Sequence, residues 1–184
     1  MKKELKYAFE FGCPFSYIAW KRILKKWQEK KFDIVFYLSG NTKKRVFSDK
    51  IWNRLIESSK KKGIHILKPA KDISLDLLSE YFLRVVPGKR VSYVSNVFTT
   101  IFEHDRDLSD TEKTEAYLSE LTKDEASSFL VDSSAEISED LNEYSVEITD
   151  TLQWARIFPA MKYEDDGICG NIDFYLVDNL LEKI

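Results

Sequence analysis

The chain has 184 residues, which fits one domain, or one domain with a large insertion, and is enough to bury a core without crosslinks. Hydrophobic residues make up 43% and aromatic residues 14%, which excludes an intrinsically disordered chain. No apolar run approaches the ~18 residues of a membrane-spanning helix, so we expect no membrane partner. The two cysteines, Cys13 and Cys169, exclude a disulfide framework and a paired-cysteine zinc site. With an N-terminus that lacks a signal-peptide pattern, they predict a cytoplasmic protein.

The charged residues are unevenly distributed, although the net charge is only −3. Residues 1–92 hold 22 Lys and Arg against 9 Asp and Glu, whereas residues 93–184 hold 6 against 22. Such asymmetry can indicate a nucleic-acid or membrane surface. Because the lysines are spread over several helical faces, we favour two complementary halves that pack together, and we expect no nucleic-acid partner.

The first forty residues show the pattern of a strand, a helix and a second strand. Apolar residues alternate through Leu5–Phe11, which predicts a strand that Gly12 ends. Pro14 suits the first position of a helix, and apolar residues then recur every three or four positions to about Lys30. Residues 32–38 are rich in β-branched and aromatic side chains and predict a second strand. The right-handed crossover rule makes the two strands parallel.

The middle of the chain shows helical periodicity. The predicted helices span residues 48–62, 74–86, 91–103, 109–121, 122–130 and 133–156. Ser109 and Glu112 have the spacing of a capping box, so we expect the fourth of these helices to begin at Ser109.

The C-terminal segment changes from helices back to strands. The pattern predicts a strand at 157–163, a hairpin turn at 165–167, the start of a return strand at 168–170, and a closing helix at 173–184. The predicted fold class is therefore α/β, a thioredoxin-like βαβ…ββα sheet with a large helical insertion after the second strand. We assign residues 1–38 and 157–184 to the thioredoxin-like domain, and residues 39–156 to the inserted helical domain.

Cys13-Pro14-Phe15-Ser16 is the segment best suited to chemistry. A cysteine at the start of a helix meets unpaired N–H groups and the positive end of the helix dipole, so we expect the pKa of Cys13 to lie below that of a free thiol. Ser16 stands where a two-cysteine redox site has its second cysteine, and a hydroxyl can hydrogen-bond a thiolate but cannot form a disulfide. The pattern predicts monothiol chemistry. The alternative is that Cys13 is a small buried core residue.

Pro159 lies near the start of the predicted third strand. In a thioredoxin-like sheet that strand begins with a cis proline opposite the active-site cysteine, which leaves the backbone of Phe158 to pair with a peptide or with glutathione. Only ~5–6% of X–Pro bonds in folded proteins are cis, and the alternative is an edge-strand proline. We expect Cys169 to lie in the core, and no metal, because neither histidine has a partner at ligand spacing.

Several segments, in the same order along the chain, resemble one known group. Residues 9–19 read FEFGCPFSYIA, residues 104–110 read HDRDLSD, residues 156–161 read RIFPAM, and residues 170–173 read GNID. They are similar to motifs of the DsbA-like thioredoxin-fold group that includes 2-hydroxychromene-2-carboxylate isomerase and kappa-class glutathione transferase. In that group the first motif reads FDFxSPYSYLA, with a catalytic serine at the position of Cys13.

The resemblance implies a glutathione site. The loop of Phe158 and Pro159 would bind the cysteinyl backbone, and the last turn, here with Asn171 and Asp173, would bind the γ-glutamyl end. That turn departs from the group, because its acid is displaced by one residue and no arginine follows.

The start of the first helix carries the other implied contacts. Pro14 and Phe15 are the further glutathione-binding residues next to the two catalytic candidates, Cys13 and Ser16. Cysteine in place of the group's serine favours its thiol-redox branch, whereas serine at position 16 argues against a two-cysteine oxidase.

Three functions remain open from the sequence. The first is a cytoplasmic monothiol thiol-disulfide oxidoreductase with glutathione as cosubstrate. The second is a glutathione-dependent isomerase or transferase that acts on an electrophilic compound, with Cys13 in place of the serine hydroxyl. The third is a thioredoxin-like scaffold that binds a protein without catalysis. The sequence leaves open whether the chain forms a homodimer.

Overall fold

The computed structural model describes residues 3–39, 46–122, 158–170 and 174–184. The chain divides into two compact units. Residues 1–41 and 144–184 form one unit, which we call the sheet unit, and residues 42–143 form the helical unit. The predicted domain boundaries at 38/39 and 156/157 stay a prediction, because the second boundary and the start of the insertion lie at or within segments outside the described residues.

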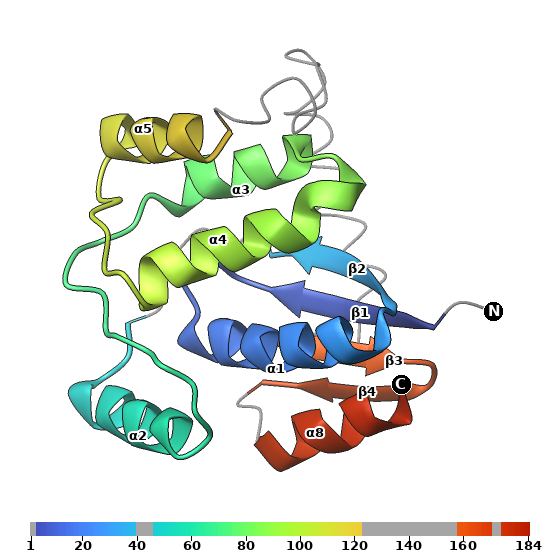
Figure 1. The fold of residues 1–184 in the computed structure, drawn as a ribbon. Coiled ribbons are helices and arrows are strands. Elements are labelled where there is room, and N and C mark those ends of the chain that lie inside the picture. Colours follow the sequence, from blue (N-terminus) through green and yellow to red (C-terminus); the bar gives the residue numbers. More distant parts are fainter. Residues whose placement is uncertain (1–2, 40–45, 123–157, 171–173) are drawn as a thin grey trace. The chain divides into compact units, whose positions relative to one another are not determined.

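The sheet unit has the predicted order β-α-β followed by β-β-α (Figure 1). Its elements are β1 (Glu4–Phe9), α1 (Pro14–Lys30), β2 (Asp33–Leu38), β3 (Ala160–Tyr163), β4 (Asp166–Cys169) and α8 (Phe174–Lys183). The four strands lie in the order β2-β1-β3-β4. β1 is parallel to β2 and antiparallel to β3, and β3 is antiparallel to β4. This topology confirms the α/β, thioredoxin-like fold class.

Helix α1 begins and ends at the residues that the sequence indicates. Pro14 occupies its first position, after Cys13 in an extended conformation at the N-cap. The helix ends at Lys31, which adopts a left-handed conformation with φ 52° and donates its backbone N–H to the Trp27 carbonyl at 2.8 Å. The chain can therefore turn at once into β2, parallel to β1.

The hairpin between β3 and β4 has a different turn from the one predicted. Tyr163 pairs with Asp166, so the loop consists of Glu164 and Asp165, with Glu164 at φ 53°. The prediction of a turn at residues 165–167 is wrong by about one residue, because Asp166 and Gly167 already belong to β4. A two-residue loop needs positive φ, and Glu164 adopts it here in place of the glycine.

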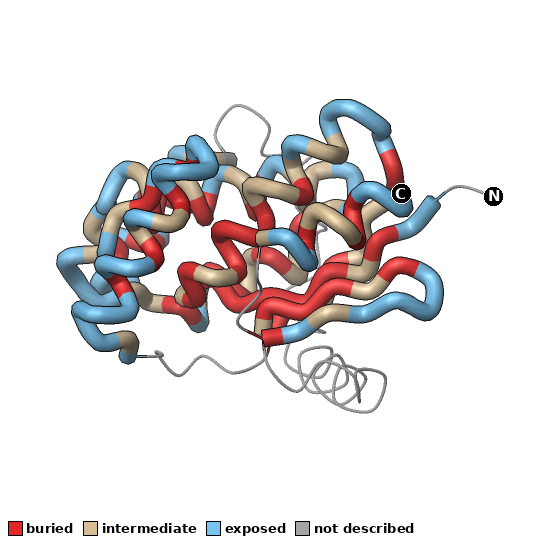
Figure 2. The backbone as a smooth tube through the Cα atoms, turned by 90° about the horizontal axis from the view of Figure 1, so that it is seen from below, coloured by how far each residue is buried: buried red, intermediate tan, exposed pale blue. Residues whose placement is uncertain are grey.

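The core of the sheet unit lies along β1, β3 and the inner face of α1. Most of β1 and β3 is buried, whereas most of β4 is exposed (Figure 2). The ring of Trp20 from α1 stacks on that of Tyr7 from β1, with the ring centroids 5.8 Å apart. This stacking fixes the start of α1 against the central strand.

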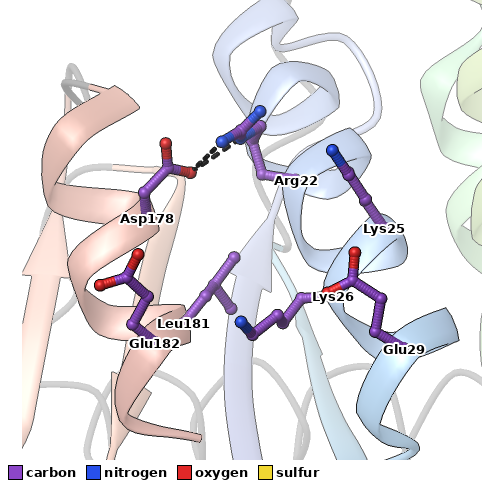
Figure 3. A pocket seen from close by; sticks show the side chains of 7 residues that line it. All are labelled: Arg22, Lys25, Lys26, Glu29, Asp178, Leu181 and Glu182. Atoms are coloured by element: carbon purple, nitrogen blue, oxygen red, sulfur yellow. Dashed lines mark hydrogen bonds and ion pairs between the residues drawn. The ribbon is translucent and has the colours of Figure 1, made fainter.

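Helices α1 and α8 contact each other beside a small polar pocket (Figure 3). Arg22 of α1 donates to a carboxylate oxygen of Asp178 of α8, from Nε at 2.8 Å and from a second nitrogen. The pocket holds about 190 Å³ and is lined by acidic and basic side chains in equal number, together with Leu181. None of the site residues predicted from the sequence lines this pocket, so the pocket is separate from the candidate site around Cys13.

The helical unit contains α2 (Asp49–Lys60), α3 (Leu75–Arg84), a short 3₁₀ helix (Pro87–Lys89), α4 (Arg90–Phe102) and α5 (Thr111–Thr122). Its fully buried side chains come mainly from α3 and α4, among them Leu78, Phe82, Tyr93, Val94, Val97 and Phe98. The helices predicted at 122–130 and 133–156 lie almost entirely outside the described residues. No described helix has both the length and the apolar character needed to cross a membrane.

Helix α5 begins one residue later than its predicted capping box implies. The carboxylate of Asp110 accepts the backbone N–H of Lys113 at 2.9 Å, so Asp110 is the capping residue. Ser109 instead donates its hydroxyl to Asp107 at 2.6 Å. Aspartate is a good N-cap, and here Asp110 has the capping role that the Ser109–Glu112 spacing suggested for Ser109.

Candidate functional site

Cys13 lies in the turn between β1 and α1. Its backbone N–H donates to the Glu10 carbonyl at 3.2 Å, and its carbonyl accepts the N–H of Tyr17 at 3.1 Å as the first bond of the helix. The side chain is 0% exposed, and its thiol takes part in no disulfide. The predicted placement at the start of a helix is confirmed, and the residue is more deeply buried than a reactive thiol usually is.

Ser16, in the first turn of α1, is the residue most directly tied to Cys13. Hydrogen bonding from its hydroxyl and from its backbone N–H lowers the pKa of the Cys13 thiol, and the backbone N–H of Phe15 acts in the same direction. The same hydroxyl accepts the backbone N–H of Glu10, with 3.3 Å between the nitrogen and the oxygen. The structure therefore brings together Cys13 and Ser16 as the sequence predicts.

The pKa of Cys13 departs from its ordinary value in the direction opposite to our prediction. Burial raises it, and the nearby negative charge of Glu10 raises it further. Hydrogen bonds from Ser16 and Phe15 lower it, but they do not outweigh the burial. The helix start favours the thiolate, but the cost of placing a charge in a buried site is larger. At neutral pH Cys13 is a protonated thiol that the first turn of α1 can stabilise as a thiolate.

Two neighbours of Cys13 were missed by the sequence analysis. Tyr7 of β1 is 0% exposed, and its hydroxyl donates to the Ser16 carbonyl at 2.6 Å. Glu10 follows β1 and is only 6% exposed, which is rare for a carboxylate. Both residues lie in the strand pattern that predicts β1, where Tyr7 occupies an inward apolar position, and only the fold reveals that their polar groups approach the thiol.

Strand β3 brings Pro159 to the same end of the sheet as Cys13. Ala160 pairs with Ala8, so the next residue outward on each strand is Pro159 beside Phe9, and Cys13 follows Phe9 by four residues. Pro159 is buried, and its carbonyl accepts the Gly170 N–H at 2.9 Å. The Phe158–Pro159 bond is cis, which confirms that prediction. That Pro159 faces Cys13 across a cleft stays a prediction.

Of the remaining predicted binding residues, three lie within the described part of the chain and two lie outside it. Pro14 is buried and Phe15 is half-buried, both in the first turn of α1 next to the thiol. Phe158 is half-buried and lies two residues before β3. Asn171 and Asp173, predicted to hold the γ-glutamyl end of glutathione, lie outside the described residues.

Cys169 differs from its prediction. It is exposed on β4, in register with Ala160, and it does not lie in the core. Within the described segments β4 is an edge strand of the sheet, so no strand pairs with it on the side away from β3. Among the same residues no three His, Cys, Asp or Glu side chains gather in a way that would hold a metal ion.

Comparison with known proteins supports the fold assignment. No protein-family model matches the sequence, and no curated protein sequence matches it either. The structure is similar to that of 2-hydroxychromene-2-carboxylate isomerase, with a TM-score of 0.73 and 19% identity over 98% of this chain and 95% of the other.

Two further solved structures are also similar to this chain. The cytosolic disulfide reductase DsbM from Pseudomonas aeruginosa, solved with GSH, has a TM-score of 0.69 and 14% identity over 98% of this chain and 96% of that chain. Reduced DsbA1 from Neisseria meningitidis has a TM-score of 0.51 and 15% identity over 99% of this chain and 84% of that chain. At these identities the comparisons show that the chain has the DsbA-like thioredoxin fold.

Proposed function

We propose that the protein is a cytoplasmic thiol-disulfide oxidoreductase in which Cys13 is the single reacting sulfur and glutathione is the thiol partner. The observation that carries the proposal is the position of Cys13 at the N-cap of α1, where donors on Ser16 and Phe15 in the first turn lower the pKa of its thiol. These donors stabilise a thiolate more than a thiol. Because Ser16 occupies the place of a second cysteine, an intermediate on Cys13 has no neighbouring thiol in the motif to displace it.

The proposed reaction proceeds by two thiol–disulfide exchanges. In the first, Cys13 loses its proton and its sulfur attacks a disulfide between glutathione and a second thiol compound. A bond forms between Cys13 and the glutathione sulfur, the original disulfide bond breaks, and the second compound leaves as a thiolate. A second glutathione thiolate then attacks the glutathione sulfur on Cys13, which releases glutathione disulfide and returns Cys13 to its reduced form. Overall, one free glutathione thiol is oxidised, the second compound is released as a thiol, and the two glutathione units leave joined as glutathione disulfide.

Glutathione binding is assigned to the backbone around the cis proline. The register of β1 with β3 supports this assignment, because it sets Phe158 and Pro159 at the end of the sheet where Cys13 lies. A main-chain pairing with the cysteinyl part of glutathione needs no particular side chain. Pro14 and Phe15 would border the bound tripeptide, and Asn171 and Asp173 would contact its γ-glutamyl end. The reductase DsbM, which shares this fold, was solved with GSH, and this supports the choice of thiol.

The proposal is tested by incubating the protein with oxidised glutathione and mapping the products by mass spectrometry. We expect a glutathione adduct on Cys13 that persists until a reduced thiol is added. The Cys169→Ser protein is the matched control and should form the same adduct, because it keeps Cys13. An adduct on Cys169 alone, or an internal disulfide between Cys13 and Cys169, would contradict the proposal.

A second function is favoured by the raised pKa of Cys13. A thiol that stays protonated can donate a hydrogen bond to the sulfur of bound glutathione, as a serine hydroxyl would, while the glutathione thiolate itself attacks an electrophile. The protein would then be a glutathione-dependent isomerase or transferase. The similarity in structure to 2-hydroxychromene-2-carboxylate isomerase is consistent with this alternative.

The substitution Cys13→Ser separates the two functions. In the oxidoreductase it removes the attacking sulfur, so glutathione-dependent disulfide reduction should fall to the level without protein. In the isomerase or transferase the serine hydroxyl still donates, so that activity should survive. If the unsubstituted protein shows neither activity and binds no glutathione by calorimetry, the result would support the non-catalytic scaffold.

A further inference from the structure

Tyr7 lies in the middle of β1, between β2 and β3, and reaches the start of α1. It is 0% exposed. Its ring stacks on Phe9, with 5.3 Å between the ring centroids and an interplanar angle of 7°, and on Trp20. These contacts leave the ring little freedom, so the position of the hydroxyl is set by the core. A buried phenol needs a hydrogen-bond partner, and the position of that partner indicates its role.

The partner of Tyr7 is the backbone of Ser16. The Tyr7 hydroxyl donates to the Ser16 carbonyl at 2.6 Å. A carbonyl in the first turn of a helix already accepts a bond from within the helix, so this second donor is not needed to complete the helix. Its effect is to tie the first turn of α1 to the central strand at the residue that hydrogen-bonds Cys13.

The Ser16 side chain is oriented by a second contact with the same strand end. Its oxygen accepts the backbone N–H of Glu10 at 3.3 Å. A hydroxyl carries one proton, and here an outside donor occupies one of its lone pairs. The proton is therefore available for the Cys13 sulfur, to which the Ser16 side chain is hydrogen-bonded. Ser16 is thus held at its carbonyl by Tyr7 and at its hydroxyl by Glu10.

We infer that Tyr7 is a positioning residue for Cys13, which acts through Ser16 by holding the serine where its hydroxyl donates to the sulfur. The inference builds on the proposed role of Cys13 and adds a residue to it. Burial, and the charge of an ionised Cys13, raise the pKa of Tyr7 well above its usual value. Tyr7 is therefore a neutral donor at neutral pH.

Removing only the hydroxyl tests this role. Tyr7→Phe keeps the stacked ring and deletes the donor to Ser16. The pH dependence of Cys13 alkylation is measured in a Cys169→Ser background, so that a single thiol reports. The loss of one positioning hydrogen bond should raise the midpoint by roughly half a pH unit to one unit. In a Ser16→Ala background the same substitution should raise the midpoint by less, because the hydroxyl is already absent and only the backbone N–H of residue 16 can still respond.

Tyr93→Phe is the matched control. Tyr93 is also 0% exposed and donates its hydroxyl to a backbone carbonyl, that of Leu78, at 2.8 Å, but it lies in the helical unit. It should lower stability to a similar extent without moving the Cys13 midpoint. A general loosening of the fold would move both midpoints alike, whereas a positioning effect moves only that of Tyr7→Phe.

Three outcomes would overturn the inference. They are an unchanged midpoint in Tyr7→Phe, an equal rise in the Ser16→Ala background, or an equal rise in Tyr93→Phe. If Tyr7→Phe does not fold, the Ser16→Ala protein tests the inference alone. An unchanged midpoint of Cys13 alkylation in Ser16→Ala would show that the Ser16 hydroxyl does not affect Cys13, and Tyr7 could then not act through it. The assay contains no glutathione, so its result is independent of whether oxidised glutathione forms an adduct on Cys13. An adduct together with an unchanged midpoint would reject the role of Tyr7 and leave the proposed function intact.

Discussion

The turn between β1 and α1 and the strand β4 each carry one cysteine, and the two sites differ in almost every physical respect. Cys13 is buried and receives hydrogen bonds from the first turn of α1. Cys169 is exposed on a strand that borders the described sheet. Exposure favours Cys169 in any reaction limited by access, whereas oriented donors favour Cys13 in a reaction that must stabilise a thiolate in place. Exposure and suitability for catalysis are therefore separate properties of a thiol.

The strongest effect should be that the more reactive of the two cysteines changes with the reagent. Iodoacetamide should modify Cys169 about tenfold faster than Cys13 or more at neutral pH, because Cys13 is buried and its pKa is raised. Oxidised glutathione should prefer Cys13, because the proposed glutathione site next to the thiol would compensate for poor access. Peptide mapping after partial reaction measures both ratios. The same preference with both reagents would remove the evidence for recognition at Cys13.

The next effect is a loss of stability in mild alkali that depends on Cys13. The folded protein holds the Cys13 proton to higher pH than the unfolded chain does. Below the unfolded thiol pKa of ~8.5 the contribution is fully present, and above it the free energy of unfolding should fall by up to about 1.4 kcal/mol per pH unit until the folded thiol ionises. Urea unfolding between pH 7 and pH 10 measures the slope.

Substitution of each cysteine provides the control for that slope. Cys13→Ser should flatten it, because serine has no proton to lose in this range. Cys169→Ser should leave it in place, because the Cys169 side chain is exposed to water in the folded protein. An equal slope in all three proteins would mean that other groups cause the loss.

The smallest effect concerns the charge beside Cys13. Glu10→Gln keeps the shape of the side chain and the backbone bonds to Cys13 and Ser16, but it removes a negative charge that raises the Cys13 pKa. The midpoint of Cys13 alkylation should therefore fall by a few tenths of a pH unit. Cys169 in the same samples is an internal reference whose rate should not change. A rise in the Cys13 midpoint would show that Glu10 stabilises the thiolate indirectly.

The β1–α1–β2 segment could be predicted from the sequence because its signals are local. Alternation of apolar residues, Pro14 at the first helical position and a second β-rich run all act over a few residues, and each element begins and ends within one or two residues of its predicted bounds. The cis bond before Pro159 was also predicted, from the order of elements around it. Where short-range preference and tertiary structure agree, the sequence is sufficient.

The features that could not be predicted depend on residues distant in sequence. The Asp-Gly pair at 166–167 has strong turn chemistry, but pairing of β4 with β3 sets the register and moves the loop to Glu164 and Asp165. The burial that raises the Cys13 pKa is likewise a property of the folded surroundings, because position 13 alone predicts only the helix dipole. The same holds for the exposure of Cys169, since its short strand could equally have had another strand beside it.

The order of the strands has a consequence for how the chain is assembled. β1 is central in the described sheet, yet one of its partners is β3, and paired residues such as Lys6 and Lys162 stand 156 positions apart. Lys3 donates its side chain to the carbonyl of Ile184, 181 positions away. Contacts of such long range cost more loop-closure entropy and slow the folding of a domain. During synthesis the turn that carries Cys13 emerges early, but it gains its neighbours on the β3 side only after the helices of the helical unit and then β3 have left the ribosome.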